Sequence, residues 1–265
     1  MNLEYIVTTC QDNSAYTQKK QVVFQQEQDE EMPFVNLYPK HCYQVFEGFG
    51  GAITEASGYA FSKMSEEKQN ETLQAYFGAD GNRYHFARMA IDSCDFSLGN
   101  YSAVTDPNDP ELSSFSLERD EKYILPLLRK AQEVSGEPID IMLSPWSPPA
   151  FMKSNGEKNG GGFLKPEYRS LWAQYLCRYV QEYRKMGFFI TMLTIQNEPK
   201  AAQKWDSCLY TAEQEKSFLK DFLYPALQRP GIHFPADLLC QNPRKQGTDK
   251  NLYPSVLHAI HFLVQ

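Results

Sequence analysis

Short apolar runs alternate with longer amphipathic segments along most of the chain. The apolar runs are of strand length and lie at 44–54, 83–91, 138–146 and 188–199. Segments with a helical spacing of apolar residues follow them at 64–78, 120–134, 167–187 and 211–227. Four strand-then-helix units in a row predict a parallel sheet that is covered by helices.

Residues at the ends of the helical segments support these boundaries. Ser65 can cap the start of the first predicted helix, and Gly78 can end it. Thr211 and Gln214 have the spacing of a capping box at the start of the last helix. Pro126 lies inside the second helix and predicts a kink there.

The segments 167–187 and 188–195 are expected at the centre of the core. The run 188–195 is nearly all apolar, which is typical of a strand that is buried on both faces. The helix before it presents an apolar stripe that can pack on such a sheet. This stripe consists of Tyr168, Leu171, Trp172, Tyr175, Leu176 and Tyr179.

Residues 1–40 differ from the rest of the chain. They are polar and rich in glutamine, and Val22–Phe24 is a short apolar run that could form one strand. We interpret residues 1–40 as an N-terminal arm from a small β element.

Two architectures cover a parallel sheet with helices, a doubly wound sheet and a (β/α)8 barrel. The glycines at 48–52 do not form the G-x-G-x-x-G of a dinucleotide site, and the chain continues into 53–57 without a convincing helix. The absence of such a phosphate-binding loop disfavours a dehydrogenase or a kinase. Residues suited to chemistry stand at the end of each strand, where a barrel carries its active site. They are Thr54, Glu55, Asp92, Asp95, Trp146, Asn197 and Glu198.

Glu198 is the sharpest catalytic candidate. Because it ends an apolar strand, we expect its carboxyl to be partly removed from water, where it holds a proton more readily and can act as a general acid. Pro199 is expected to keep Glu198 in an extended backbone conformation. Asn197 offers a side-chain amide to a substrate hydroxyl. The alternative is a solvated glutamate before a turn.

Four other side chains have both a functional and a structural interpretation. Trp146 lies among three prolines and can stack on a sugar ring or pack under the turn. Asp92 and Asp95 can accept hydrogen bonds from sugar hydroxyls, bind a metal ion or cap a helix. Arg88 lies within a strand and, if buried, needs a carboxylate partner.

The glycine-rich loop at 155–163 is the last feature near the predicted site. It follows the third strand and could be either a mobile lid or a flexible surface loop.

Composition narrows the function classes. The net charge of -7, with no basic block, argues against a nucleic-acid partner. No apolar run approaches the ~18 residues of a membrane span. Residues 1–20 lack the pattern of a signal peptide, which predicts a cytoplasmic protein. The scattered cysteines are expected to be free thiols, and neither a metal site nor a cofactor is expected.

Four motifs, in order, resemble glycoside hydrolase family 30, the glucosylceramidase-like glycosidases. They are QVFEGFGGAITEAS, RMAIDSCDFS, LSPWSPPAFMKSNG and TIQNEP. The resemblance implies a TIM barrel beside a small β-sandwich and a hydrolysis of β-glycosides that retains the anomeric configuration. It implies that Glu198 is the acid/base, that Asp95, Trp146 and Asn197 bind the sugar next to the scissile bond, and that Arg88 supports the catalytic carboxylates. The substrate stays open among glucosylceramide, β-1,6-glucan and small β-glucosides, β-xylosides or β-fucosides.

The chain departs from the family after about Gly231. The family's nucleophile is a second glutamate on a later strand, and we expect it to be absent from this chain. A fifth strand is expected near 232–242, but residues 232–265 read as a divergent or frame-shifted tail. The predicted organisation is an arm at 1–40, a partial barrel at 41–231 with about four to five βα units, and this tail. The alternative to a glycosidase is a truncated, catalytically inactive barrel fragment.

Overall fold

A computed structural model describes residues 2–11, 14–23, 38, 40–43 and 48–229. The chain divides into two compact units, Met1–Phe46 and Glu47–Gln265. The predicted tail at 232–265 lies outside the described residues.

The first unit contains a β-hairpin where the sequence predicted a single short strand. Strands β1 (Asn2–Gln11) and β2 (Ser14–Val23) pair antiparallel along their whole length. The predicted strand Val22–Phe24 corresponds to the end of β2, and Phe24 itself lies outside the described residues. The β-branched residues 6–9 favour β1. Two of them are threonines, however, so the segment does not stand out as an apolar run.

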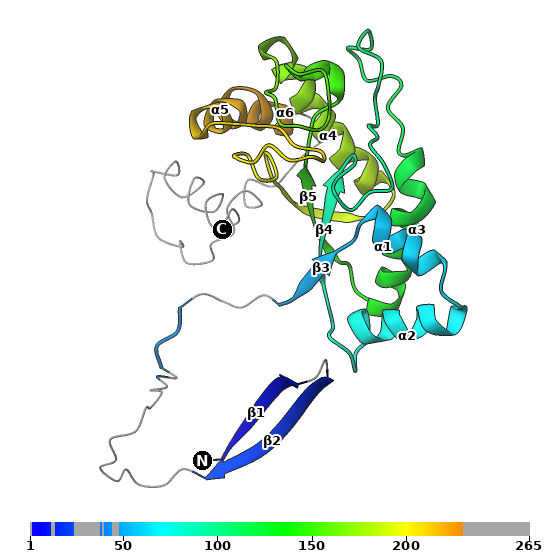
Figure 1. Cartoon of the computed structure of the whole chain (residues 1–265), viewed down its shortest axis with the longest axis vertical. Helices are drawn as coiled ribbons and strands as arrows, with labels where there is room; N and C mark the ends of the chain where they lie inside the picture. Colours follow the sequence, from blue (N-terminus) through cyan, green and yellow to red (C-terminus); the bar gives the residue numbers. More distant parts are fainter. Residues whose placement is uncertain (1, 12–13, 24–37, 39, 44–47, 230–265) are drawn as a thin grey trace. The chain divides into compact units, whose positions relative to one another are not determined.

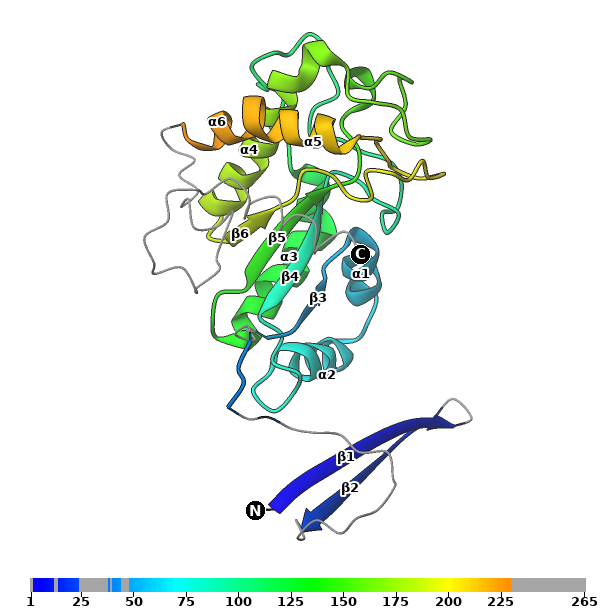
Figure 2. The same cartoon turned by 90° about the vertical axis from the view of Figure 1, so that its left-hand side faces the viewer.

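The second unit is built on a parallel sheet of four strands. These are β3 (Gly50–Ala52), β4 (Phe86–Ile91), β5 (Asp140–Pro145) and β6 (Phe189–Leu193). They lie side by side in sequence order, β3-β4-β5-β6 (Figures 1 and 2). A doubly wound sheet reverses its strand order at a switch point, whereas a barrel adds each strand beside the last. The described sheet is therefore an arc of a barrel, and the doubly wound alternative is wrong.

A β-bulge interrupts the pairing of β5 with β6. Ile141 lies opposite Ile190, but the next residue of β5, Met142, lies opposite Met192. Thr191 is the extra residue, and it shifts the register of everything that follows it in β6.

Six α-helices accompany the sheet in the described part of the chain. They are α1 (Glu55–Ser62), α2 (Glu66–Phe77), α3 (Glu118–Ser135), α4 (Arg169–Lys185), α5 (Ala212–Phe218) and α6 (Tyr224–Leu227). Figure 2 shows α3 behind β4 and β5, with α1 and α2 beside it. These helices lie on one face of the sheet, as in the outer ring of a barrel.

The predicted helix caps are confirmed. Ser65 is the N-cap of α2, where its side chain accepts a hydrogen bond from a backbone N–H, and Gly78 follows the last residue of that helix. Thr211 and Gln214 form the predicted capping box of α5.

Two helical features differ from the prediction. The chain was expected to continue past the glycines without a helix, but α1 begins there, capped by reciprocal hydrogen bonds between Thr54 and Ser57. The predicted helix over 211–227 is divided by a π-helical segment, Leu219–Leu223. A π-helix widens a helix by one residue, and the spacing of apolar residues does not reveal it.

The two faces of the sheet are buried to different degrees. On the helix-covered face, Met89, Ile141 and Leu143 are almost fully buried. On the other face, Arg88 and Met142 are partly exposed. In β6 itself, Phe189 is 53% exposed and Met192 and Leu193 are only partly buried, so the prediction that this strand is buried on both faces is wrong for the described residues. The partly exposed face is the one that a barrel turns toward its interior.

A buried carboxyl joins α3 to its neighbours. Asp120, in the first turn of α3, accepts hydrogen bonds from the hydroxyls of Tyr101 at 2.8 Å and Tyr183 at 2.7 Å. Burial raises the pKa of Asp120 to about 7, although both phenols oppose this shift. The carboxyl therefore gains a proton in the folded chain near neutral pH.

This protonation makes Asp120→Asn a test of the buried carboxyl. From the ordinary pKa of 3.8 up to about 7, the folded chain keeps a proton that the unfolded chain has lost. The parent chain should therefore lose stability as the pH rises through this window and level off above it. Relative to the parent, the variant should gain up to about 1.4 kcal/mol per pH unit, as measured by denaturant unfolding at a series of pH values.

Asp109→Asn is the control for this measurement. Asp109 is exposed, and hydrogen bonds from Ser114 and Ser113 lower its pKa. Its effect on stability should therefore not change between pH 4.5 and 7. A flat difference for Asp120→Asn over the same range would contradict a proton-binding buried carboxyl.

Candidate active site

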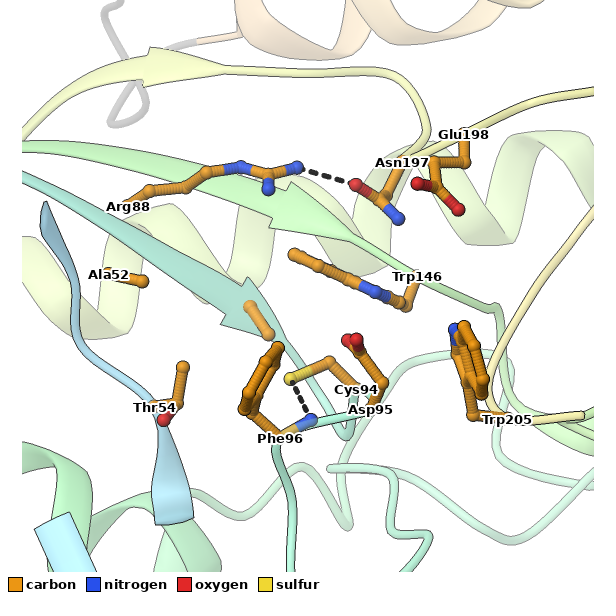
Figure 3. A pocket seen from close by; sticks show the side chains of 11 residues that line it. Ala52, Thr54, Arg88, Cys94, Asp95, Phe96, Trp146, Asn197, Glu198 and Trp205 are labelled. Carbon is orange, nitrogen blue, oxygen red and sulfur yellow. Dashed lines mark hydrogen bonds between the residues drawn. The ribbon is translucent and has the colours of Figure 1, made fainter. Parts of the chain in front are cut away.

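A single cavity lies at the C-terminal ends of the four parallel strands. It has a volume of about 210 Å³ and is lined by all five side chains to which the family resemblance gave a role, Arg88, Asp95, Trp146, Asn197 and Glu198 (Figure 3). Its lining consists of Ala52, Thr54, Arg88, Ala90, Cys94, Asp95, Phe96, Trp146, Asn197, Glu198 and Trp205. Each of the four strands contributes a residue, either from its own end or from the loop that follows.

Arg88 is the centre of this arrangement. Its guanidinium donates hydrogen bonds to Asn197 Oδ1 at 2.7 Å and to Ser144 Oγ at 3.0 Å. It also lies 4.6 Å from the centre of the Trp146 ring, a distance typical of a cation–π contact. Burial lowers the pKa of Arg88, and the negative charge of groups such as Asp95 opposes this shift. Its closest hydrogen-bond partners are neutral, whereas the sequence led us to expect a carboxylate.

Asn197 is oriented by Arg88. Because Oδ1 accepts from the guanidinium, the amide NH₂ is left to face the cavity (Figure 3). The backbone N–H of Asn197 donates to Pro145 O at 2.8 Å. This bond holds the residue beside the end of β5. The NH₂ group of Asn197 is therefore a hydrogen-bond donor that is held in a fixed position in the cavity.

Glu198 differs from its prediction in two respects. Its backbone has a φ of 46°, in the left-handed region, whereas an extended conformation was expected before Pro199. Few residues other than glycine adopt this region, and such strain is often found at functional sites. The side chain is also exposed rather than partly removed from water. The expected removal of this carboxyl from water is therefore not found among the described residues.

Aromatic side chains form much of the cavity wall. Trp146 is buried and packs with Ala90 and Cys94. Phe96 and Trp205 are much more exposed, at 60% and 39%. Neither was predicted. Trp205 stands in a polar loop beyond the last strand, where only its hydrophobic character marked it as unusual.

Two carboxylates at strand ends lie outside the cavity. Asp92 accepts hydrogen bonds from the hydroxyls of Tyr175 at 2.6 Å and Tyr179 at 3.0 Å, and its other oxygen lies 3.3 Å from Lys158 Nζ. Glu55 pairs with Arg119. Both carboxylates therefore support the structure, and only Asp95 of the pair Asp92 and Asp95 faces the cavity.

Clusters of metal ligands and membrane-spanning helices are both absent from the described residues. Within residues 48–229 and the other described ranges, no group of three or more His, Cys, Asp or Glu side chains could hold a metal ion. No helix in the same ranges is long and apolar enough to cross a membrane. Among the described residues, the thiols of Cys94, Cys177 and Cys208 are buried and form no disulfide.

Sequence comparisons agree with the geometry. The signature of the glycosyl hydrolase family 30 TIM-barrel domain matches residues 46–240. Lysosomal acid glucosylceramidase from Mus musculus is 36% identical over 73% of this chain and 39% of its own length. Putative glucosylceramidase 3 from Caenorhabditis elegans is 38% identical over 70% of this chain and 37% of its own length. The chain thus spans less than half the length of these relatives.

Solved structures give the same result for the fold. SrfJ from Salmonella typhimurium is 39% identical, with a TM-score of 0.80 over 88% of this chain and 52% of that one. The endo-β1,6-glucanase BT3312 is 28% identical, with a TM-score of 0.66 over 72% of this chain and 43% of that one. The predicted barrel type and the family resemblance are confirmed.

Arg88→Lys tests the importance of the guanidinium to the site. Lysine cannot donate two hydrogen bonds in the plane of a guanidinium while stacking on a ring. We expect the free energy of unfolding to fall by about 2 kcal/mol, as measured by denaturant unfolding. The control is Arg129→Lys on α3, where the side chain is exposed and the change should be under about 0.5 kcal/mol. Equal effects of the two substitutions would contradict a special role for Arg88.

Proposed function

Because the chain belongs to glycosyl hydrolase family 30 over residues 46–240, we propose that it forms the acid/base side of the active site of a retaining β-glycosidase. One observation carries the proposal. The side chains of the four family motifs surround one cavity at the C-terminal ends of successive parallel strands. Such a cavity is where barrel enzymes perform their chemistry.

Glu198 is the proposed acid/base. It gives a proton to the glycosidic oxygen while the bond from that oxygen to the anomeric carbon breaks and a second carboxylate bonds to that carbon. It then takes a proton from the water that hydrolyses the glycosyl intermediate. Its exposure at the cavity edge suits both steps, because aglycone and water must each reach it from outside.

The other cavity side chains are proposed to hold the sugar. The NH₂ of Asn197 would donate to a ring hydroxyl, and Asp95 would accept from one or two hydroxyls. The face of Trp146 would stack on the C–H surface of the ring. Arg88 would keep Asn197 and Trp146 in place and add positive charge near the carboxylates.

The nucleophile is proposed to lie outside the described residues. A retaining enzyme needs two carboxyl groups ~5–5.5 Å apart. In the described part of the chain, the cavity carries only the carboxylates of Asp95 and Glu198, and Asp95 has the role of a sugar ligand. This observation also favours a second candidate function for the 265-residue chain, which is sugar binding without efficient turnover.

A glucose residue is the proposed occupant of the cavity. Two relatives are named as glucosylceramidases and one structural neighbour as an endo-β1,6-glucanase, and glucose is the sugar common to these names.

The chain by itself should hydrolyse 4-nitrophenyl β-glucoside and β-xyloside far more slowly than a full-length relative, because general acid catalysis alone contributes roughly 10²–10⁴-fold. Azide, a small nucleophile, should raise the rate. It would attack the anomeric carbon opposite the aglycone, release nitrophenol and leave an α-glycosyl azide. Nitrophenol is measured by absorbance, and the glycosyl azide by NMR.

Glu198→Gln should lower the azide reaction, and Glu213→Gln, on the exposed surface of α5, should not. Ordinary glycosidase rates without azide, lost in Glu198→Gln, would show that the chain contains its own nucleophile. If the parent chain showed neither ordinary turnover nor glycosyl azide formation with either sugar, the glycosidase proposal would be wrong.

A further inference from the structure

The glycine-rich loop is bonded to the segment that follows Glu198. The N–H of Gly160 donates to Gln203 O at 2.8 Å, and the N–H of Gly161 donates to Ser207 Oγ at 2.9 Å. An antiparallel bridge joins the same two segments. The loop is thus neither a free lid nor a plain surface loop, because it supports the chain next to the cavity.

Gln203 is held on both sides of its backbone. Its carbonyl accepts from Gly160, and its own N–H donates to Ser207 Oγ at 3.1 Å. Ser207 is almost completely buried, with 4% of its surface exposed. The backbone of Gln203 is therefore held in place, although its loop lies on the surface.

The side chain of Gln203 reaches the proposed acid/base. Its Nε2 donates to Glu198 Oε2 at 3.3 Å. In the described part of the chain, this is the one side-chain hydrogen bond to the Glu198 carboxyl. We propose that Gln203 is a positioning residue that keeps this carboxyl directed at the cavity, and that the glycine-rich loop serves to hold Gln203. The inference rests on the proposed role of Glu198.

The exposure of Glu198 explains why such a residue is needed. A general acid must lie within hydrogen-bond reach of the atom that it protonates. An exposed glutamate without a partner samples several rotamers, and ordering it costs conformational entropy. Gln203 would supply that order while leaving the second carboxyl oxygen available to the substrate.

Gly161 provides an independent way to disturb Gln203. It has a φ of 72°, and a Cβ added there would lie 2.8 Å from the Cβ of Ala202. Gly156 has nearly the same backbone conformation, with a φ of 69°, but a Cβ there would meet nothing within 4 Å. Gly161→Ala and Gly156→Ala therefore share the backbone penalty, and only the first pushes on the residue before Gln203.

The first test is spectroscopic and needs no activity. The full chain is prepared with ¹³C in the glutamate side-chain carboxyl groups, and the Glu198 signal is identified by its loss in Glu198→Gln. Gln203→Met and Gly161→Ala should each shift this signal and leave most other glutamate signals in place. The controls Gln74→Met, on the exposed surface of α2, and Gly156→Ala should leave it unchanged. An unmoved Glu198 signal in Gln203→Met would overturn the proposed contact.

The second test asks whether the contact serves proton transfer. With azide present, Gln203→Met should slow the reaction of 4-nitrophenyl β-glucoside roughly three- to tenfold, and that of the 2,4-dinitrophenyl glucoside much less, because dinitrophenolate leaves without a proton. A general structural defect would slow both substrates alike, which would overturn the positioning role. If Glu198→Gln itself slowed the 4-nitrophenyl and the 2,4-dinitrophenyl glucoside equally, the proposed function would fail. The spectroscopic test would still decide whether Gln203 contacts Glu198.

Discussion

The contact between the Arg88 guanidinium and the Asn197 amide is the interaction on which the cavity depends. It joins β4 to the chain after β6, and the hydroxyl of Ser144 between them adds the contribution of β5. A partly buried cation must be satisfied by acceptors, and an unsatisfied one would be costly. Here one acceptor, Ser144, lies in β5 and the other, Asn197, follows β6. The charge of Arg88 therefore holds the ends of these strands at a fixed distance from β4. The Trp146 ring completes this environment from the side.

A second polar layer lies beneath the cavity, on the face of the sheet that the helices cover. Four members of the predicted apolar stripe are fully buried, namely Trp172, Tyr175, Leu176 and Tyr179, but Tyr175 and Tyr179 keep their hydroxyls paired. Tyr175 and Tyr179 both donate to Asp92, and Tyr183 donates to Asp120. These hydrogen bonds hold the end of β4 against α4. The loop that carries Asp95 into the cavity therefore starts from a rigid point.

The sequence revealed those parts of the structure whose cause is local. Buried strands appear as apolar runs, and the caps at Ser65 and Thr211 appear as hydroxyl residues at helix starts. The helix α1 was also capped by such a pair, Thr54 and Ser57, but the glycines before it obscured the signal. A residue before proline prefers an extended backbone, and the sequence therefore predicted an extended Glu198. Its left-handed conformation could not be predicted, because tertiary contacts override that local preference. Trp205 reaches the cavity through the folding of its loop, which no periodicity describes.

The bulge at Thr191 has a consequence for how this sheet tolerates change. Side chains along a strand alternate between its two faces, so one inserted residue reverses the facing of all that follow. Beyond the bulge, Thr194 faces Ser144, and their hydroxyls lie 2.6 Å apart. If Thr191 were paired in the ladder instead of bulged out, Leu193 would lie opposite Ser144 and bring an apolar side chain beside Arg88. The bulge therefore gives this strand tolerance in its length as well as in its composition, since deleting Thr191 would restore regular pairing and leave Thr194 opposite Ser144.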